Sequence, residues 1–170
     1  VRHADFDGDG YEDVLSGRHV VLNTGTNRGD FSATPVEYWK YGPTPRFVTL
    51  ADVDADGDVD IIVVPRDDSD YHGGDTDSVL QYLLNDGSGD FSNAERVMPV
   101  YMEDTGFGSQ VEVEIAVDVE VTAIAAGRFG GVASDLVMMD LTGITFFTST
   151  TTDLMYTRQS LLLLPTGAVT

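Results

Sequence analysis

The chain has 170 residues, no cysteine and a formal net charge of −20, because 29 acidic side chains stand against 9 Lys and Arg. A surface this acidic repels nucleic acid and anionic lipid, so neither is expected as a partner. The lack of cysteine excludes disulfide bonds and thiol chemistry, and no apolar run of about 18 or more residues is available to insert into a membrane. Because the sequence does not begin with Met, we expect a processed chain or a piece of a longer one.

Residues 1–45 form the first expected unit, which is expected to be incomplete at its start and opens with an acidic loop. The aspartates of this loop are Asp5, Asp7, Asp9 and Asp13. Short strands are expected directly after the loop and over residues 19–23. A turn over residues 23–30 and a further run over residues 31–41 complete the unit.

Residues 46–101 form the second unit, whose acidic loop lies between two apolar runs. Carboxylates fall at loop positions 1, 3, 5 and 9, which are Asp52, Asp54, Asp56 and Asp60. Gly57 supplies a sharp turn at position 6, and the carbonyl of Asp58 at position 7 can point at the same centre. Side-chain oxygens that alternate inward around such a turn wrap a hard cation, so the loop predicts a calcium site.

The first loop repeats the second in register. Asp5 and Asp52 are 47 residues apart, and the aspartates and the turn glycine of the two loops match one for one. A repeat of this length indicates a copied supersecondary unit. The sequence therefore predicts two calcium sites.

Residues 121–170 are expected to hold a degenerate third unit and a tail, with strands over 121–129, 134–139, 144–148 and 154–164. Its loop keeps Asp135 but lacks the inward carboxylates, so no metal is expected there. The intervening residues 102–120 are expected to form an inserted loop and a strand. The strand, over 111–121, is predicted by strict alternation: one face is Val or Ile throughout, and the other carries Glu112, Glu114, Asp118 and Glu120.

The acidic loops, each running into an apolar strand, and the Gly-Asp-Phe-Ser turns at residues 29–32 and 89–92 resemble FG-GAP/VCBS repeats, the blades of integrin-alpha-like β-propellers. The resemblance implies an all-β fold of four-stranded antiparallel blades, β-propeller-like, with about three units. It also implies the composition of the two calcium sites: Asp5, Asp7, Asp9 and Asp13 with the carbonyl of Tyr11, and Asp52, Asp54, Asp56 and Asp60 with the carbonyl of Asp58.

Three units are too few to close a propeller, which has about 4 to 8 blades. The open sheet edges that remain invite pairing with another chain. We therefore expect the fold to be incomplete, or completed by other copies, through a homo-oligomer or further repeats of a longer chain. The strand over 111–121 and the apolar tail over 160–165 are the segments expected to cross between subunits.

Two long loops, over residues 67–77 and 102–110, are candidates for binding a protein or a glycan, since long loops on a rigid scaffold commonly carry binding. The candidate residues are Asp68, Asp70, Tyr71, His72, Asp75, Tyr101 and Phe107. Their rings would stack on a sugar and their carboxylates would accept hydroxyl hydrogen bonds; a merely solvated insertion is the alternative. Arg28-Gly-Asp30 spells the tripeptide that integrins bind, but its counterpart Ser88-Gly-Asp90 identifies it as the hairpin turn of the repeat.

We expect an extracellular or cell-surface protein, because weak calcium loops fill where the ion is at roughly millimolar concentration. The expected function is that of a calcium-stabilised adhesion or structural protein, a subunit of a surface assembly or filament. The alternative is a carbohydrate-binding or accessory module of a secreted polysaccharide-acting enzyme. Catalysis by the chain is not expected, because His3, His19 and His72 are scattered in the sequence and the metal loops account for many of the aspartates.

Overall fold

The computed structural model describes residues 1–25, 29–32, 34–40, 42–66, 78–117, 121–129, 133–140, 143–150 and 154–163. Within these ranges the chain is built from short β-strands and a single 3-10 turn, η1 (Phe91–Asn93). The expectation of an all-β fold with four-stranded antiparallel units is confirmed. No helix among the described residues is long and apolar enough to cross a membrane.

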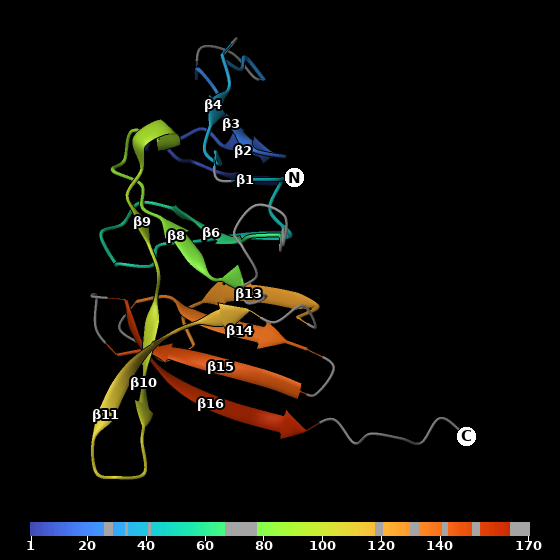
Figure 1. Cartoon of the computed structure of the whole chain (residues 1–170). Helices are drawn as coiled ribbons and strands as arrows, with labels where there is room; N and C mark the ends of the chain where they lie inside the picture. Colours follow the sequence, from blue (N-terminus) through green and yellow to red (C-terminus); the bar gives the residue numbers. More distant parts are fainter. Residues whose placement is uncertain are drawn as a thin grey trace.

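Among the described residues, three larger sheets follow one another along the chain (Figure 1), and a fourth sheet has two strands. The first contains β1 (Arg2–Ala4), β2 (Asp13–Ser16), β3 (His19–Val21) and β4 (Val36–Glu37). The second contains β5 (Phe47–Ala51), β6 (Asp60–Val64), β8 (Gln81–Leu83) and β9 (Arg96–Val97). Both are antiparallel meanders with the acidic loop between their first two strands.

The third sheet begins from the same meander and is then widened. Its repeat strands are β13 (Ala123–Gly127), β14 (Asp135–Met139), β15 (Gly143–Ser149) and β16 (Met155–Leu163), which correspond to the four strands expected for the third unit. A hairpin of β10 (Val100–Asp104) and β11 (Gln110–Glu114) adds two strands beyond β16, with β10 parallel to β16. The expected boundary after residue 101 lies within β10.

Two expectations for the segment between the second and third units are wrong. Residues 102–110 are not a free loop, because they form most of the β10–β11 hairpin, closed by a hydrogen bond from the N–H of Thr105 to the carbonyl of Ser109 (3.0 Å). Nor is the strand over 111–121 continuous. It breaks at Ile115, between β11 and β12 (Ala116–Val117), and β12 pairs with β7 (Ser78–Val79).

The break has a physical cause in the packing of Ile115. Its side chain is fully buried between the second and third sheets. Its N–H donates to the carbonyl of Pro99 (3.0 Å), and its carbonyl accepts from the N–H of Leu80 (2.9 Å). The backbone therefore changes partner at this residue, which periodicity alone does not reveal.

Two apolar cores lie between successive sheets. Strand β6 contributes to both, because successive side chains of a strand point to opposite faces. Ile61 and Val63 pack in the core shared with the first sheet, and Ile62 and Val64 pack in the core shared with the third. Burial on both faces explains the continuous apolar run after the second acidic loop. The second core also carries a hydrogen bond from Tyr82 Oη to Tyr156 Oη (2.9 Å).

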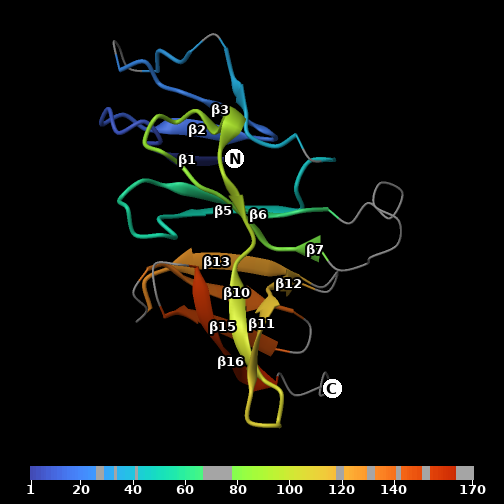
Figure 2. The same cartoon turned by 60° about the vertical axis from the view of Figure 1, so that its left-hand side comes forward.

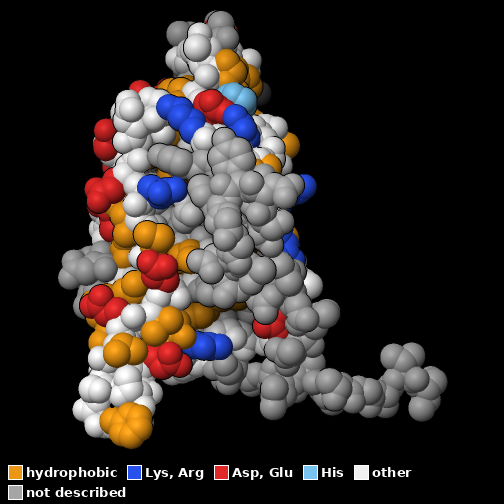
Figure 3. Space-filling view, viewed as in Figure 1, with side chains coloured by type: hydrophobic (Ala, Val, Ile, Leu, Met, Phe, Trp, Pro, Cys, Tyr) orange, Lys and Arg blue, Asp and Glu red, His pale blue; other side chains and the backbone are white. Residues whose placement is uncertain are grey.

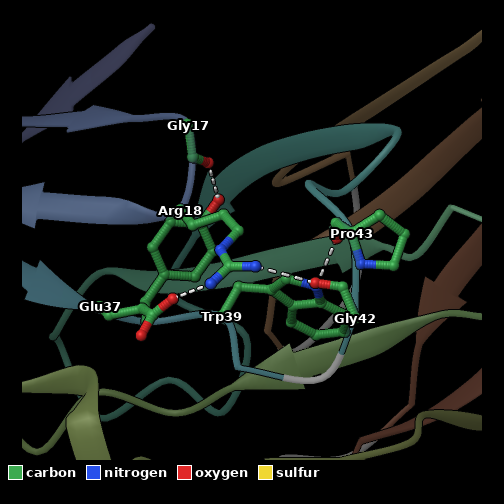
Figure 4. Close-up of polar contacts among 7 residues, drawn as sticks. Gly17, Arg18, Glu37, Trp39, Gly42 and Pro43 are labelled. Atoms are coloured by element: carbon green, nitrogen blue, oxygen red, sulfur yellow. Dashed lines mark hydrogen bonds and ion pairs between the residues drawn. The ribbon is translucent and has the colours of Figure 1, made fainter.

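At the outer edge of the first sheet, the polar ends of two buried aromatic side chains donate hydrogen bonds to backbone carbonyls (Figure 4). Tyr38 and Trp39 are both buried; Tyr38 Oη donates to the carbonyl of Gly17 (2.8 Å) and Trp39 Nε1 to the carbonyl of Pro43 (2.9 Å). Arg18 forms an ion pair with Glu37 at the same edge. Aromatic rings with a bonded polar tip thus anchor the segment that leads into the second unit.

The inner strands of the three units lie in a row. Strand β5 contacts both β1 and β13. From this row the first and third sheets extend in opposite directions, upward and downward in Figure 1, and Figure 2 gives the same order. The three sheets therefore diverge from a row formed by their first strands. The acidic loops follow two of these strands, β1 and β5.

Candidate metal centres

The last aspartate of each acidic loop is buried and accepts hydrogen bonds from two backbone N–H groups. We call it the bracket aspartate. Asp13 Oδ2 accepts the N–H of Phe6 (2.8 Å), and its Oδ1 accepts the N–H of Asn23 (2.7 Å). These bonds tie the start of the loop to the end of the third strand of the unit. Both oxygens of the carboxylate are thus engaged inside the fold.

The same bracket recurs in the other two units. Asp60 accepts the N–H groups of Val53 (2.7 Å) and Asn85 (2.8 Å). In the third unit, Asp135 accepts those of Phe129 (2.7 Å) and Ser149 (2.8 Å). Because the third loop lacks the other carboxylates, this aspartate has a structural role that does not depend on a metal.

Each of the first two loops brings three carboxylates together around this bracket. One ligand oxygen from each member of a group lies within 4.8 Å of the others. The groups are Asp5, Asp7 and Asp13, and Asp52, Asp54 and Asp60. Clustered carboxylate oxygens are the ligands that Ca²⁺ and Mg²⁺ prefer, so each group can hold a metal ion. They are the groups of this kind found among the described residues.

The remaining predicted ligands lie outside these groups. Asp9 Oδ1 accepts the N–H of Tyr11 (2.9 Å), and Asp56 Oδ1 accepts the N–H of Asp58 (2.9 Å). These local bonds hold the turn of each loop. Coordination by Asp9 and Asp56, and by the carbonyls of Tyr11 and Asp58, stays a prediction.

The electrostatics of the groups favour a bound cation. Burial raises the pKa of Asp60 from 3.8 to about 7, against the lowering effect of its two backbone hydrogen bonds. Burial, followed by smaller effects that include the neighbouring carboxylates, also raises the pKa of Asp7, Asp13 and Asp54. A divalent ion would relieve both effects, because it stabilises the charged carboxylates.

An orphaned oxygen marks the second loop as the better formed centre. Oδ1 of Asp52 is buried and has no hydrogen-bond partner. In the first loop, the matching Asp5 accepts the N–H groups of Asp9 (3.1 Å) and Gly10 (2.9 Å). A buried carboxylate oxygen without a donor is costly and calls for an unseen partner, which a cation in the group would supply.

The candidate ligand residues outside the loops are not brought together. Tyr101 is buried against Phe147 with Arg158 over its ring, whereas Phe107 is fully exposed at the tip of the β10–β11 hairpin. Asp68, Asp70, Tyr71, His72 and Asp75 lie outside the described residues, as does Arg28.

A pocket beside Tyr101 was missed by sequence reasoning. It has a volume of about 280 Å³ and an apolar floor on the third sheet, and its polar rim includes Glu114, Asp140 and Arg158. Arg158 Nη1 donates to Tyr101 Oη (3.3 Å). The three rim residues are far apart in sequence, so no local pattern could have found them.

Fold and loops together define a class: an all-β repeat protein with acidic loops between the first two strands of successive units. Comparison with protein families agrees, since residues 5–63 match the model of the FG-GAP-like repeat. This stretch spans both acidic loops, and it confirms the resemblance to FG-GAP/VCBS repeats. No curated protein and no solved structure gives a significant match to the chain.

Proposed function

We propose that this chain is an extracellular, calcium-stabilised structural or adhesion module, which serves as a subunit of a surface assembly and has no catalytic role. The observation that carries the proposal is the paired geometry of the two carboxylate groups, each built on a buried bracket aspartate at the same place in its unit. FG-GAP-like repeats are typically extracellular, which agrees with ion sites that fill at roughly millimolar calcium.

Calcium bound at these loops would stabilise the folded chain. Three carboxylates crowd at the turn that joins the first two strands of a unit, and without a cation their repulsion and desolvation oppose folding. An ion that binds only the folded chain stabilises it by about 2.7 kcal/mol per site when its concentration is 100 times the dissociation constant. The expected result is a stiff array of sheets, suited to bearing load or presenting a surface.

Calorimetric titration with Ca²⁺ tests the proposal. We expect two calcium ions per chain in the native protein and one in the Asp54→Asn variant. Asp104→Asn is the matched control, because Asp104 is an exposed aspartate on the β10–β11 hairpin, and it should still bind two. Absence of any calcium binding by the native chain would contradict the proposed function.

The pocket beside Tyr101 favours a second candidate, a carbohydrate-binding or accessory module. Polar groups around an apolar floor suit a small polar ligand, and the combination of Arg158 with Glu114 and Asp140 offers both a donor and acceptors to a sugar. Binding on a glycan array that is lost in Arg158→Ala but kept in Arg96→Ala would support it. An array without binding would remove this candidate.

A further inference from the structure

The three units present their faces in a fixed order. In β6, the residue directly after the bracket aspartate, Ile61, packs toward the first sheet, and the next residue, Ile62, packs toward the third. The counterpart of Ile61 in the third unit is Leu136, which packs toward the second sheet. The counterpart of Ile62 in the first unit is Leu15, which also packs toward the second. Every unit thus has one face for its predecessor and one for its successor.

The successor face of the third unit is open. Val137 is the counterpart of Ile62, and it pairs across the sheet with Phe146, as Ile62 pairs with Tyr82. Around this pair lie apolar side chains that none of the described sheets covers, and they include Met139 and Phe129, both exposed. We call Phe129, Val137, Met139, Ile144 and Phe146 the third-unit face. It repeats the pattern that the second unit uses to bind the third.

The predecessor face of the first unit is open as well. Val14 is the counterpart of Ile61, and it pairs with Val21 as Ile61 pairs with Leu83. Phe31, in the Gly-Asp-Phe-Ser turn, matches Phe91 of the second unit, which packs in the same core as Ile61 and Leu83. We call Val14, Val21 and Phe31 the first-unit face.

One aromatic contact at the existing junction identifies how two open faces would meet. Phe6 of the first unit meets Phe91 of the second edge to face, with ring centroids 5.4 Å apart. Phe129 is the counterpart of Phe6, because the N–H of each donates to its bracket aspartate. Phe31 is the counterpart of Phe91. Phe6 and Phe91 are 1% and 3% exposed, whereas Phe129 and Phe31 are 61% and 41% exposed.

Two further features of the first unit are those of a unit that packs against a preceding unit. Asn85 Nδ2 donates to the carbonyl of Phe6 across the junction (2.8 Å), while Nδ2 of its counterpart Asn23 donates to the carbonyl of Glu12, within its own unit (3.3 Å). A side chain added at Gly89 would collide with the first unit, at 2.8 Å, whereas one added at its counterpart Gly29 would meet open space. The first unit therefore has the features of a unit with a preceding neighbour, and none of the described residues fills that place.

We propose that a second copy of this chain is that neighbour, with the third-unit face of each copy against the first-unit face of the other. Phe129 then meets Phe31 as Phe6 meets Phe91. Two copies of three units give six, within the range of 4 to 8 in which propellers close. This inference rests on the proposed function, because it names a second copy of the chain as the neighbour of one subunit in the proposed assembly.

Light scattering in millimolar calcium tests the pairing. We expect a dimer, at twice the single-chain mass of 18.3 kDa. Phe31→Asp and Phe129→Asp should each return the mass to that of the monomer. Phe107→Asp is the matched control, because Phe107 is 95% exposed but lies on the hairpin tip, and it should leave the dimer intact. Figure 3 shows that the hydrophobic surface at the lower end of the molecule, where the β10–β11 hairpin lies, is set apart from the hydrophobic surface higher up.

Mixing the two monomeric variants adds a sharper test. One copy then keeps a native Phe129 and the other a native Phe31, so a single intact junction forms and the dimer reappears. A contact between identical faces would not recover in this way.

Cross-linking locates the junction. The chain has no cysteine, so the Ser32→Cys, Arg128→Cys double variant reacts only where intended. Ser92, the counterpart of Ser32, accepts a hydrogen bond from Lys40 of the first unit (2.8 Å), which places this position at a junction. A short bismaleimide should join residue 32 of one copy to residue 128 of the other. A monomer in calcium, or a dimer untouched by both Phe variants, would overturn the inference. Two bound calcium ions in the same sample would leave the proposed function standing.

Discussion

Asp60 Oδ1 accepts the backbone N–H of Asn85 at 2.8 Å, and so ties the acidic loop of the second unit to a residue that follows its third strand. Hydrogen bonds to a charged acceptor contribute about 1.5–3 kcal/mol each. We expect Asp60→Ala to lower the free energy of unfolding by about 2–4 kcal/mol in chelator, measured by urea denaturation. Asp135→Ala should cost a similar amount. A negligible loss in both variants would contradict the structural role of the bracket.

The charge at Asp52 should behave in the opposite way without metal. Its Oδ1 is buried and unpartnered, so the charged group costs free energy in the empty loop. Asp52→Asn should therefore keep or slightly raise the melting temperature in chelator and abolish the rise that calcium gives at this loop. Asp86→Asn, at an exposed site, is the control and should keep the calcium effect. A large loss of stability in chelator would contradict this account of Asp52.

The raised pKa of Asp60 predicts an unusual pH dependence. The carboxyl has a pKa of about 7 in the folded chain and an ordinary value near 3.8 when unfolded. Between these values the unfolded chain releases a proton that the folded chain keeps, so stability in chelator should fall as pH rises from about 4 to 7. Calcium requires the charged form, so the gain in melting temperature from calcium should grow over the same window. Melting curves at pH 5 and 7.5 check both signs.

The hydroxyl pair of the second core should respond asymmetrically to mutation. Tyr82 Oη donates to Tyr156 Oη, which in turn contacts the carbonyl of Ser134 (3.3 Å). Tyr82→Phe leaves Tyr156 with that acceptor and should cost about 1 kcal/mol. Tyr156→Phe strands the buried hydroxyl of Tyr82 and should cost about 1–3 kcal/mol. Equal losses in denaturant unfolding would argue against this direction of donation.

Much of the fold follows from local patterns. The apolar runs beside the acidic loops predicted the strand after the first loop and the strands on both sides of the second. The glycines and Asp135 were enough to place the third loop. Alternation over 111–121 also identified a strand. It could not place the break at Ile115, because that depends on hydrogen bonds to Pro99 and Leu80, and on a core that forms only when two sheets meet.

The candidate metal centres were likewise predicted only in part from local sequence patterns. The spacing of carboxylates predicted two groups, and three members of each gather in the structure. The bracket role of Asp13 and Asp60 was missed, because their second donors, Asn23 and Asn85, lie 10 and 25 residues further along the chain. The β10–β11 hairpin was missed as well, since its place is fixed by parallel pairing with β16, over 50 residues away.

Thermal unfolding of the native chain, in millimolar calcium and then in excess chelator, tests the central claim most directly. The account predicts a melting temperature that rises with calcium concentration, because the ion binds two loops of the folded chain and stabilises it by mass action. The rise should be roughly halved in Asp54→Asn. Identical melting curves in calcium and in chelator would contradict the claim that calcium holds this array of sheets together.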